Sequence, residues 1–237
     1  MSDLRIALIA EGPLDYVIIN AALTAILGER QFVLTQLQPE QTHPYLGNGW
    51  GGVMKWCHAA SERHQGCLED DPTLIDFDLL ILHLDVDVSG FNYQQCGDDI
   101  VMRSQQLGWL ALPCARPCPP ASDSAHALAD VLRSWLRRAE PGARSILCLP
   151  AQSTGAWLAA AVLPPDHVLL QGAECCTELE DRLSSLPLGQ RIRKSRRSYI
   201  DKMPQLRQNW SQVKTCCAQA RCFEQDIHAA LQLIGVV

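Results

Sequence analysis

The stretch "LRIALIAEGPLDYVIINAALTAILG" (residues 4–28) decides the fold, because in it an apolar strand passes into a helix through a single glutamate. Residues 4–10 form a short apolar run, which predicts a buried strand. The apolar residues that follow recur at helical spacing, and Pro13 and Asp15 both suit a helix start. Glu11 therefore lies where a buried strand should end, and a charged group at that point needs an explanation.

A second acidic stretch, "FDLLILHLDVDVSG" (residues 77–90), contains the strongest strand pattern of the chain and ends in carboxylates. Because side chains alternate along a strand, Asp85 and Asp87 are predicted to point to the same side. In parallel α/β sheets, reactive groups collect where strands end. If the two strands are neighbours, Glu11, Asp85 and Asp87 converge and repel one another. A divalent cation with oxygen ligands, Mg²⁺ or Mn²⁺, would resolve that repulsion.

The remaining pattern alternates strands with helices, which predicts an α/β fold with a parallel sheet of about four strands flanked by helices. Residues 1–172 are expected to form this domain, and residues 173–237 a mostly helical C-terminal extension packed on it. Ser122 or Ser124 is expected to cap a helix. Further strands are predicted at 31–37 and 143–151, with a short one at 167–172. Further helices are predicted at 50–64, 122–140 and 153–163. Residues 91–122 are expected to be irregular.

Composition and charge exclude several classes of protein. No apolar run reaches the roughly 18 residues of a membrane span, and the N-terminal apolar run is too short for a signal peptide, so we expect a cytoplasmic protein without a membrane partner. The net charge of −6 argues against a wholly basic nucleic-acid-binding surface. The spacing of the 11 cysteines fits neither a zinc site nor a disulfide framework, which favours free, mostly buried thiols.

One local patch is strongly basic: the run "QRIRKSRRSY" (residues 190–199). Such a run is often only a solvated face, but it is the one local patch suited to holding the phosphates of a nucleic acid. The candidate nucleic-acid-binding residues are Arg191, Arg193, Lys194, Arg196 and Arg197.

Together, "AEGPLDYVI" (residues 10–18) and "LHLDVDVSG" (residues 82–90) resemble the two motifs of the Toprim domain, which topoisomerases, bacterial primases and OLD-family nucleases share. That domain carries Glu-Gly after its first strand and Asp-x-Asp after its third, on a sheet of about four parallel strands. The chain looks most similar to small stand-alone prokaryotic Toprim-like proteins associated with phage defence. "LPAQSTGAWLAAAVL" (residues 149–163) and the tail at 199–231 carry this closer similarity.

The resemblance implies a Mg²⁺-dependent nuclease acting on DNA or RNA, in an antiviral defence system with a partner ATPase of the ABC or SMC type. Glu11 would act as general acid/base or beside the metal, Asp85 and Asp87 would hold Mg²⁺ (or Mn²⁺), and Asp15 would be a further ligand. Lys202 would neutralise the phosphate in the transition state. Glu174 or Glu178 could add carboxylates, although both could equally be surface acids of a helix.

Two alternatives stay open. The similar proteins often carry Glu just before Ala-Trp, where this chain has Gly155, so the chain could be a non-catalytic or conditionally active subunit of an ATPase complex. A homo-oligomer is a separate possible assembly. "DVDVS" also resembles the nucleophile loop of haloacid-dehalogenase-type phosphatases, in which Asp85 would attack phosphorus and Asp87 would serve as acid/base. That alternative leaves Glu11 unexplained.

Overall fold

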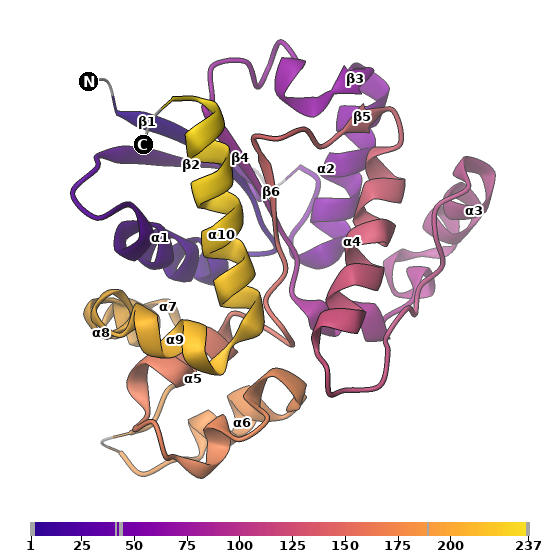
Figure 1. The fold of residues 1–237 in the computed structure, drawn as a ribbon. Helices are drawn as coiled ribbons and strands as arrows, with labels where there is room; N and C mark the ends of the chain where they lie inside the picture. The colour runs from indigo at the N-terminus through magenta and orange to yellow at the C-terminus, as the bar shows by residue number, and fades with distance from the viewer. Residues whose placement is uncertain (1–2, 41, 43–44, 189, 236–237) are drawn as a thin grey trace.

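The computed structural model describes residues 3–40, 42, 45–188 and 190–235. A four-stranded sheet lies at its centre, in the order β2-β1-β4-β6, and every neighbouring pair in it is parallel (Figure 1). This confirms the predicted parallel α/β fold. The strands are β1 (Leu4–Ile9), β2 (Phe32–Gln38), β4 (Leu79–His83) and β6 (Ser145–Cys148), while the two-residue strands β3 (Gly66–Cys67) and β5 (Ala139–Glu140) pair separately.

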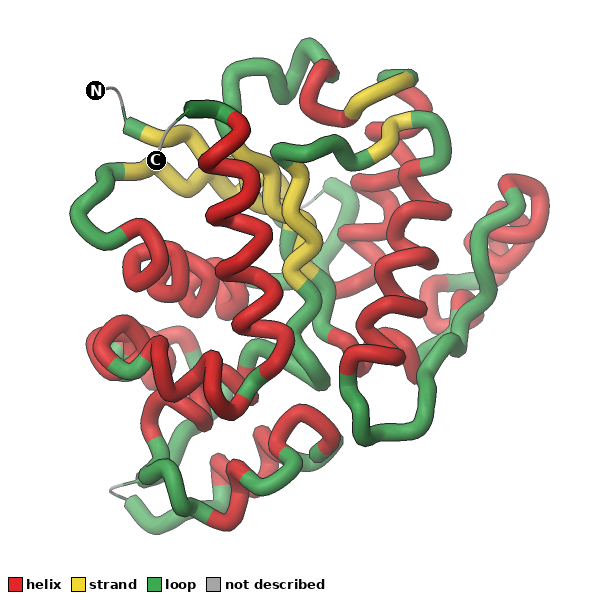
Figure 2. Tube along the Cα trace, viewed as in Figure 1, coloured by secondary structure: helices red, strands yellow, loops and turns green. Residues whose placement is uncertain are grey.

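Helices cover both faces of the sheet, as Figure 2 shows. Alternating side chains of each central strand supply the two apolar cores: Ile6 and Leu8 of β1 join one cluster, and Ala7 and Ile9 join the other. The helices on the first side are α1 (Pro13–Leu27), α5 (Gly155–Val162) and α10 (Ala218–Leu233), and those on the second are α2 (Gly49–Arg63) and α4 (Ser122–Leu136).

The C-terminal segment is helical, as predicted, and packs on α1, α5 and β6. The ring of Trp157 in α5 lies 5.5 Å from that of Trp210 and 5.6 Å from that of Phe223, between ring centroids. These contacts place the segment in the same apolar core as β1 and α1. Its helices before α10 are α6 (Leu179–Ser184), α7 (Arg196–Ile200), α8 (Met203–Gln208) and α9 (Trp210–Cys216).

Several local predictions were wrong. The segment expected to be irregular contains helix α3 (Asp98–Leu107), which begins after Gly97 with two aspartates and ends at the left-handed Gly108. The expected strand at 167–172 is a 3₁₀ turn, because His167 Nδ1 accepts a hydrogen bond from the amide of Leu169.

Neither proposed serine caps α4. Residue Ala121 holds the cap position, and the Ser124 hydroxyl instead bonds the backbone of Arg116 in the preceding loop. The cysteine prediction was wrong at one pair: Cys118 and Cys175 form a disulfide, although 57 positions separate them in the chain. Of the nine free cysteines only three are buried, so the expectation of mostly buried thiols was also wrong. Spacing rules cannot detect a pair that only the packing of two loops brings together.

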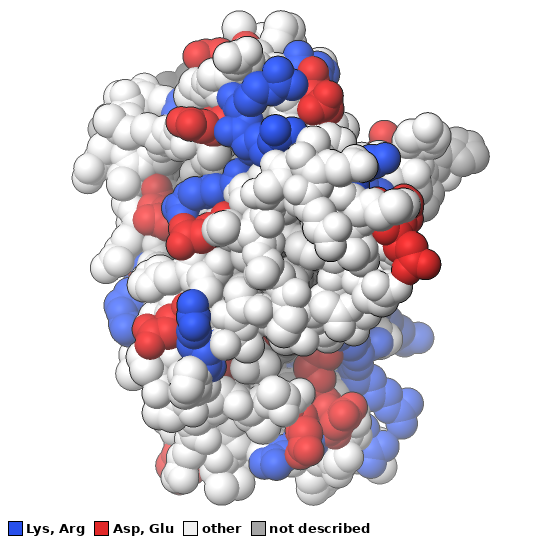
Figure 3. Space-filling view, turned by 90° about the vertical axis from the view of Figure 1, so that its right-hand side faces the viewer, with Lys and Arg blue, Asp and Glu red and all other residues white. Residues whose placement is uncertain are grey.

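None of the described helices combines the length and the apolar character needed to cross a membrane. Charged side chains of both signs are interspersed on the face that Figure 3 shows, with a wide uncharged area between them. This face, on the side of α3 and α4, is therefore no extended basic surface.

A buried carboxylate ties the end of α2 to the loop that leads into β4. Asp71 has no exposed surface and accepts hydrogen bonds from Arg63 Nε at 2.7 Å and from the amide and hydroxyl of Thr73. Burial raises its pKa, but the hydrogen bonds from Arg63 and Thr73 outweigh burial and lower it overall. The stability that comes from this ionisation is thus present above the usual aspartate pKa of about 4 and is lost as the pH falls below it.

We predict that Asp71→Asn lowers the free energy of unfolding by about 2 kcal/mol at pH 7, because the Arg63 guanidinium loses its charged partner. Urea denaturation measures the change, and the difference from wild type should shrink towards pH 3. Asp70→Asn, at the exposed neighbouring residue, is the matched control and should have little effect. A difference that is equally large at pH 3 and pH 7 would contradict the assignment.

Candidate functional site

The strand order creates a topological switch point between β1 and β4. From β1 the chain passes to β2 on one side, and later returns to β4 on the other side of β1. In open parallel sheets, ligands bind in the crevice outside the carboxyl ends of strands at such a point. Ile9 of β1 is paired with Leu82 of β4, so the residues that follow the two strands meet at this edge.

Glu11 and Asp85 are brought together as predicted. Glu11 Oε1 accepts a hydrogen bond of 2.8 Å from the backbone amide of Asp85. The expected common orientation of Asp85 and Asp87 was wrong, because β4 ends at His83 and a 3₁₀ turn, Val86–Gly90, begins directly after Asp85. Asp87 is exposed and lines a neighbouring cavity instead.

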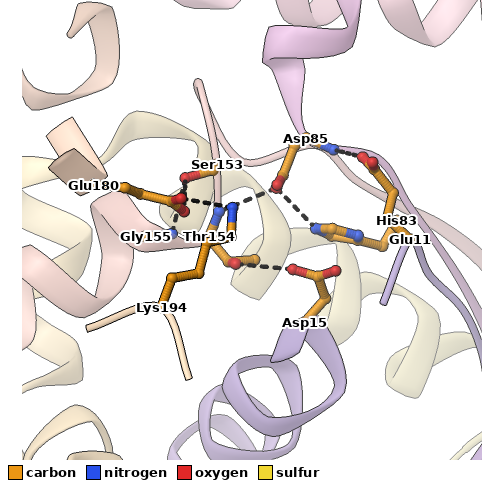
Figure 4. A network of polar contacts seen from close by, with 9 residues as sticks. All are labelled: Glu11, Asp15, His83, Asp85, Ser153, Thr154, Gly155, Glu180 and Lys194. Atoms are coloured by element: carbon orange, nitrogen blue, oxygen red, sulfur yellow. Dashed lines mark hydrogen bonds and ion pairs between the residues drawn. The ribbon is translucent and has the colours of Figure 1, made fainter. Parts of the chain in front are cut away.

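Asp15, His83 and Asp85 form the most compact group of potential metal ligands at this edge. One ligand atom from each lies within 4.8 Å of those of the other two. Figure 4 shows the carboxylate of Asp85 directed towards the His83 ring and that of Asp15 approaching from helix α1. His83 Nε2 lies 3.2 Å from Asp85 Oδ1, yet neither ring nitrogen of this fully buried histidine makes a hydrogen bond to a described residue.

Thr154 holds the two aspartates in place from the start of helix α5. Its backbone amide donates to Asp85 Oδ1 at 3.0 Å, and its hydroxyl donates to Asp15 Oδ1, also at 3.0 Å. The loop after β6 thereby fixes the positions of carboxylates that come from α1 and from the end of β4 (Figure 4).

The pKa values of Glu11, Asp15 and His83 are all raised. Burial, followed by the charge of Asp85, raises the pKa of Glu11 well above its usual range. Burial raises the pKa of Asp15 to about 6, with His83 opposing the shift. Burial lowers the pKa of His83, but Asp15 and Asp85 outweigh it and raise the value to about 9. The protein alone therefore balances its carboxylates with the charge of His83.

This donor set fits a divalent cation. Two carboxylates and one imidazole supply three ligand atoms, and a cation would relieve the crowding of negative charge. Carboxylate oxygens suit Mg²⁺ and Mn²⁺, and imidazole suits several transition metals, so the donor set by itself does not select one ion.

A further carboxylate lies beside the group. Glu180 of α6 accepts a hydrogen bond from the Ser153 hydroxyl at 2.9 Å and forms an ion pair of 2.6 Å with Lys194. A Cβ atom at Gly155 would lie 2.8 Å from Glu180 Oε1, so the absence of a side chain at Gly155 makes room for this carboxylate. The family resemblance leads us to expect a glutamate at position 155, where this chain has glycine. The carboxylate of Glu180 lies in the space that a side chain at position 155 would need.

Other predicted site residues lie elsewhere. Glu178 pairs with Arg182 at the exposed surface, and Glu174 accepts a hydrogen bond from the amide of Gln219. Lys202 precedes helix α8, and the lysine that lines the cavity of the acidic group is Lys194. The other basic residues of the run at 190–199 have different surroundings. Arg191 donates a hydrogen bond to the carbonyl of Leu186, and Arg196 lines a separate cavity. Arg193 and Arg197 are exposed.

Sequence reasoning missed three contributors to the site. His83 was not among the predicted site residues, although its place two residues before Asp85 at a strand end was a usable signal. Thr154 and Glu180 gave no signal, because a lone threonine before a helix and an acid on a short helix are common surface features.

No protein-family model, curated protein or solved structure matches the chain. The likeness to Toprim proteins therefore rests on the two short motifs, and the implied activity stays a prediction.

Removing one carboxylate charge should stabilise the metal-free protein and weaken cation binding. Asp15→Asn keeps the oxygen that accepts the Thr154 hydrogen bond but removes a buried charge. We expect a midpoint of thermal unfolding a few degrees higher than wild type without metal, and loss of most of the additional stabilisation by Mn²⁺. Differential scanning calorimetry with and without Mn²⁺ measures both effects.

Asp166→Asn, at an exposed position, is the control and should change neither value. Full stabilisation of Asp15→Asn by Mn²⁺ would exclude Asp15 as a ligand.

Proposed function

We propose that this protein is a Mn²⁺- or Mg²⁺-dependent enzyme that hydrolyses phosphodiester bonds of DNA or RNA. The observation that carries the proposal is the convergence of Asp15, His83 and Asp85 at the switch point of the sheet. Asp15 and Asp85 line a cavity of about 220 Å³ together with Glu11 and Lys194, and His83 is buried beside Asp85. A cation held by the acidic groups, and a lysine at the same cavity, would both offer positive charge to the phosphate of an ester substrate.

Each residue of the site would have a distinct role. Asp15, His83 and Asp85 would hold the cation, which when bound supplies positive charge to the phosphate and to an attacking water. Glu11 fixes the backbone at Asp85, and Thr154 orients the two aspartates. Lys194 is exposed and linked only to Glu180 by an ion pair, so it can turn towards a phosphate oxygen.

The broader proposal includes a partner ATPase and a role in antiviral defence, and it rests on the sequence resemblance alone. If the chain is a conditionally active subunit, cleavage should appear only after assembly with its partner. Co-purification of the tagged protein from its native host, followed by cleavage assays of the assembly and of the isolated chain, separates the two cases.

A phosphatase mechanism is the second candidate, because Asp87 follows Asp85 by two positions and is exposed. It requires Asp85 as nucleophile and Asp87 as acid/base, on a phosphomonoester. In the proposed nuclease Asp87 lies in the adjoining cavity, outside the compact ligand group.

We predict that Asp85→Asn reduces Mn²⁺-dependent cleavage of nucleic acid by about 100-fold or more, because losing a ligand charge removes several kcal/mol of transition-state stabilisation. The asparagine retains the acceptor for the Thr154 amide, so the fold should be preserved. Labelled single-stranded and duplex oligonucleotides, both DNA and RNA, are the substrates, with gel analysis of products.

Asp87→Asn is the matched control and should cost less than about tenfold, the low end of effects from residues beside a metal's ligands. Turnover of 4-nitrophenyl phosphate that requires both aspartates, without cleavage of nucleic acid, would favour the phosphatase instead. Unchanged nuclease activity of purified Asp85→Asn would refute the proposed site.

A further inference from the structure

Two larger cavities flank the metal cavity along the carboxyl edge of the sheet. One, of about 490 Å³, lies where β2 ends and α1 begins, and Gln36 and Pro39 are among its lining residues. The other, of about 450 Å³, lies beyond β4 and β6, and Val86 and Gln152 are among its lining residues. Their positions follow the strand order β2-β1-β4-β6, with the metal cavity between them.

The three cavities adjoin one another. Pro13 lines both the first flanking cavity and the metal cavity. On the other side, Asp85 of the metal cavity is followed directly by Val86 of the second flanking cavity, and Gln152 lies two residues before Thr154. They therefore form a row across the switch point.

Among the described residues that line the first flanking cavity are an aromatic ring, an arginine and a carboxylate: Tyr16, Arg196 and Glu40. An aromatic face stacks on any nucleobase, and a guanidinium group pairs with phosphate. A carboxylate accepts hydrogen bonds from the exocyclic amino groups of bases.

The second flanking cavity repeats this combination with Phe91, Arg116 and Asp87. Arg116, like Arg196, is an exposed side chain at the cavity wall. The same three chemical groups therefore lie on both sides of the metal cavity, although they come from unrelated segments of the chain.

The volumes of the three cavities agree with nucleotides in the two flanking cavities and a phosphate group in the central one. Both flanking cavities are within the range of about 300 to 1,000 Å³ that is typical of sites for small organic ligands, which includes a nucleotide. The central cavity, of about 220 Å³, is smaller than that range and suits a phosphate group with its cation.

We infer that the flanking cavities bind the nucleotides on either side of the scissile phosphate of an unpaired nucleic-acid strand. This inference rests on the proposed function and specifies its substrate class: a single-stranded polynucleotide cut internally. Bases within a duplex are stacked and paired, so their faces cannot reach the two rings.

Binding tests the inference without requiring turnover. Fluorescence anisotropy with Ca²⁺ in place of Mn²⁺ measures affinity for a labelled 12-nucleotide single strand, as DNA and as RNA, and for the matching duplex. Arg116→Ala and Arg196→Ala should each weaken single-strand binding about tenfold, the double variant more, and the duplex should bind wild type at least about tenfold more weakly.

Arg138→Ala is the control. Its guanidinium is exposed and pairs with Glu62 at 3.5 Å, next to β5, and single-strand affinity should stay within about twofold of wild type. Phe91→Leu adds a test of stacking, since leucine keeps an apolar side chain against Trp50 but offers no ring face.

Turnover of bis(4-nitrophenyl) phosphate with Mn²⁺ separates the inference from the proposed function. This small diester tests the metal cavity, and Arg138→Ala, whose guanidinium pairs with Glu62 next to β5, should hydrolyse it at the wild-type rate. If wild type does not hydrolyse it or any oligonucleotide, the proposed function fails. If wild type is active but the arginine variants bind the single strand as tightly as wild type does, or wild type binds the duplex equally well, the inference is overturned.

Discussion

Crowding of charge at the switch point is the constraint on which this structure depends. Glu11, Asp15 and Asp85 line one small cavity with His83 buried beside them, and burial together with the charge of Asp85 raises the pKa values of Glu11 and Asp15. In the protein alone, the positive charge of His83 balances part of this negative charge. A divalent cation would balance it more completely, because it interacts with all the carboxylates at short range. Such concentrated buried charge is costly for a fold and is typical of functional sites.

The surrounding architecture keeps these groups in place. The parallel pairing of β1 with β4 sets the approach of Glu11 to the Asp85 amide, and the start of α5 clamps two aspartates through Thr154. Helix α6 adds Glu180 to the same cavity, and the segment before α7 adds Lys194. The site is thus assembled from both ends of the chain, and the C-terminal segment contributes to it directly.

Much of the fold could be predicted, because apolar strands bounded by turns and amphipathic helices carry strong local signals. The four strands and the helices that follow them were found in this way. Helix α3 was missed, and of its four apolar side chains only that of Ile100 is buried. The Cys118–Cys175 pair was missed because it joins loops distant in sequence. The orientation of Asp87 was wrong for a related reason: a 3₁₀ turn ended the strand earlier than the apolar run did.

The sequence by itself determined the parallel sheet and the positions of Glu11 and Asp85 at the ends of two of its strands. The spacing of apolar residues and the residues that follow each strand can be read from short segments of the chain. Only the tertiary structure decided which other groups join them. His83 became a potential ligand because its strand ends at that residue, and Thr154 and Glu180 were brought in by packing of α5 and α6. The row of cavities likewise depends on the order of strands in the sheet. Contacts between distant segments follow from the complete packing of the chain, to which every element contributes, and short motifs do not encode them.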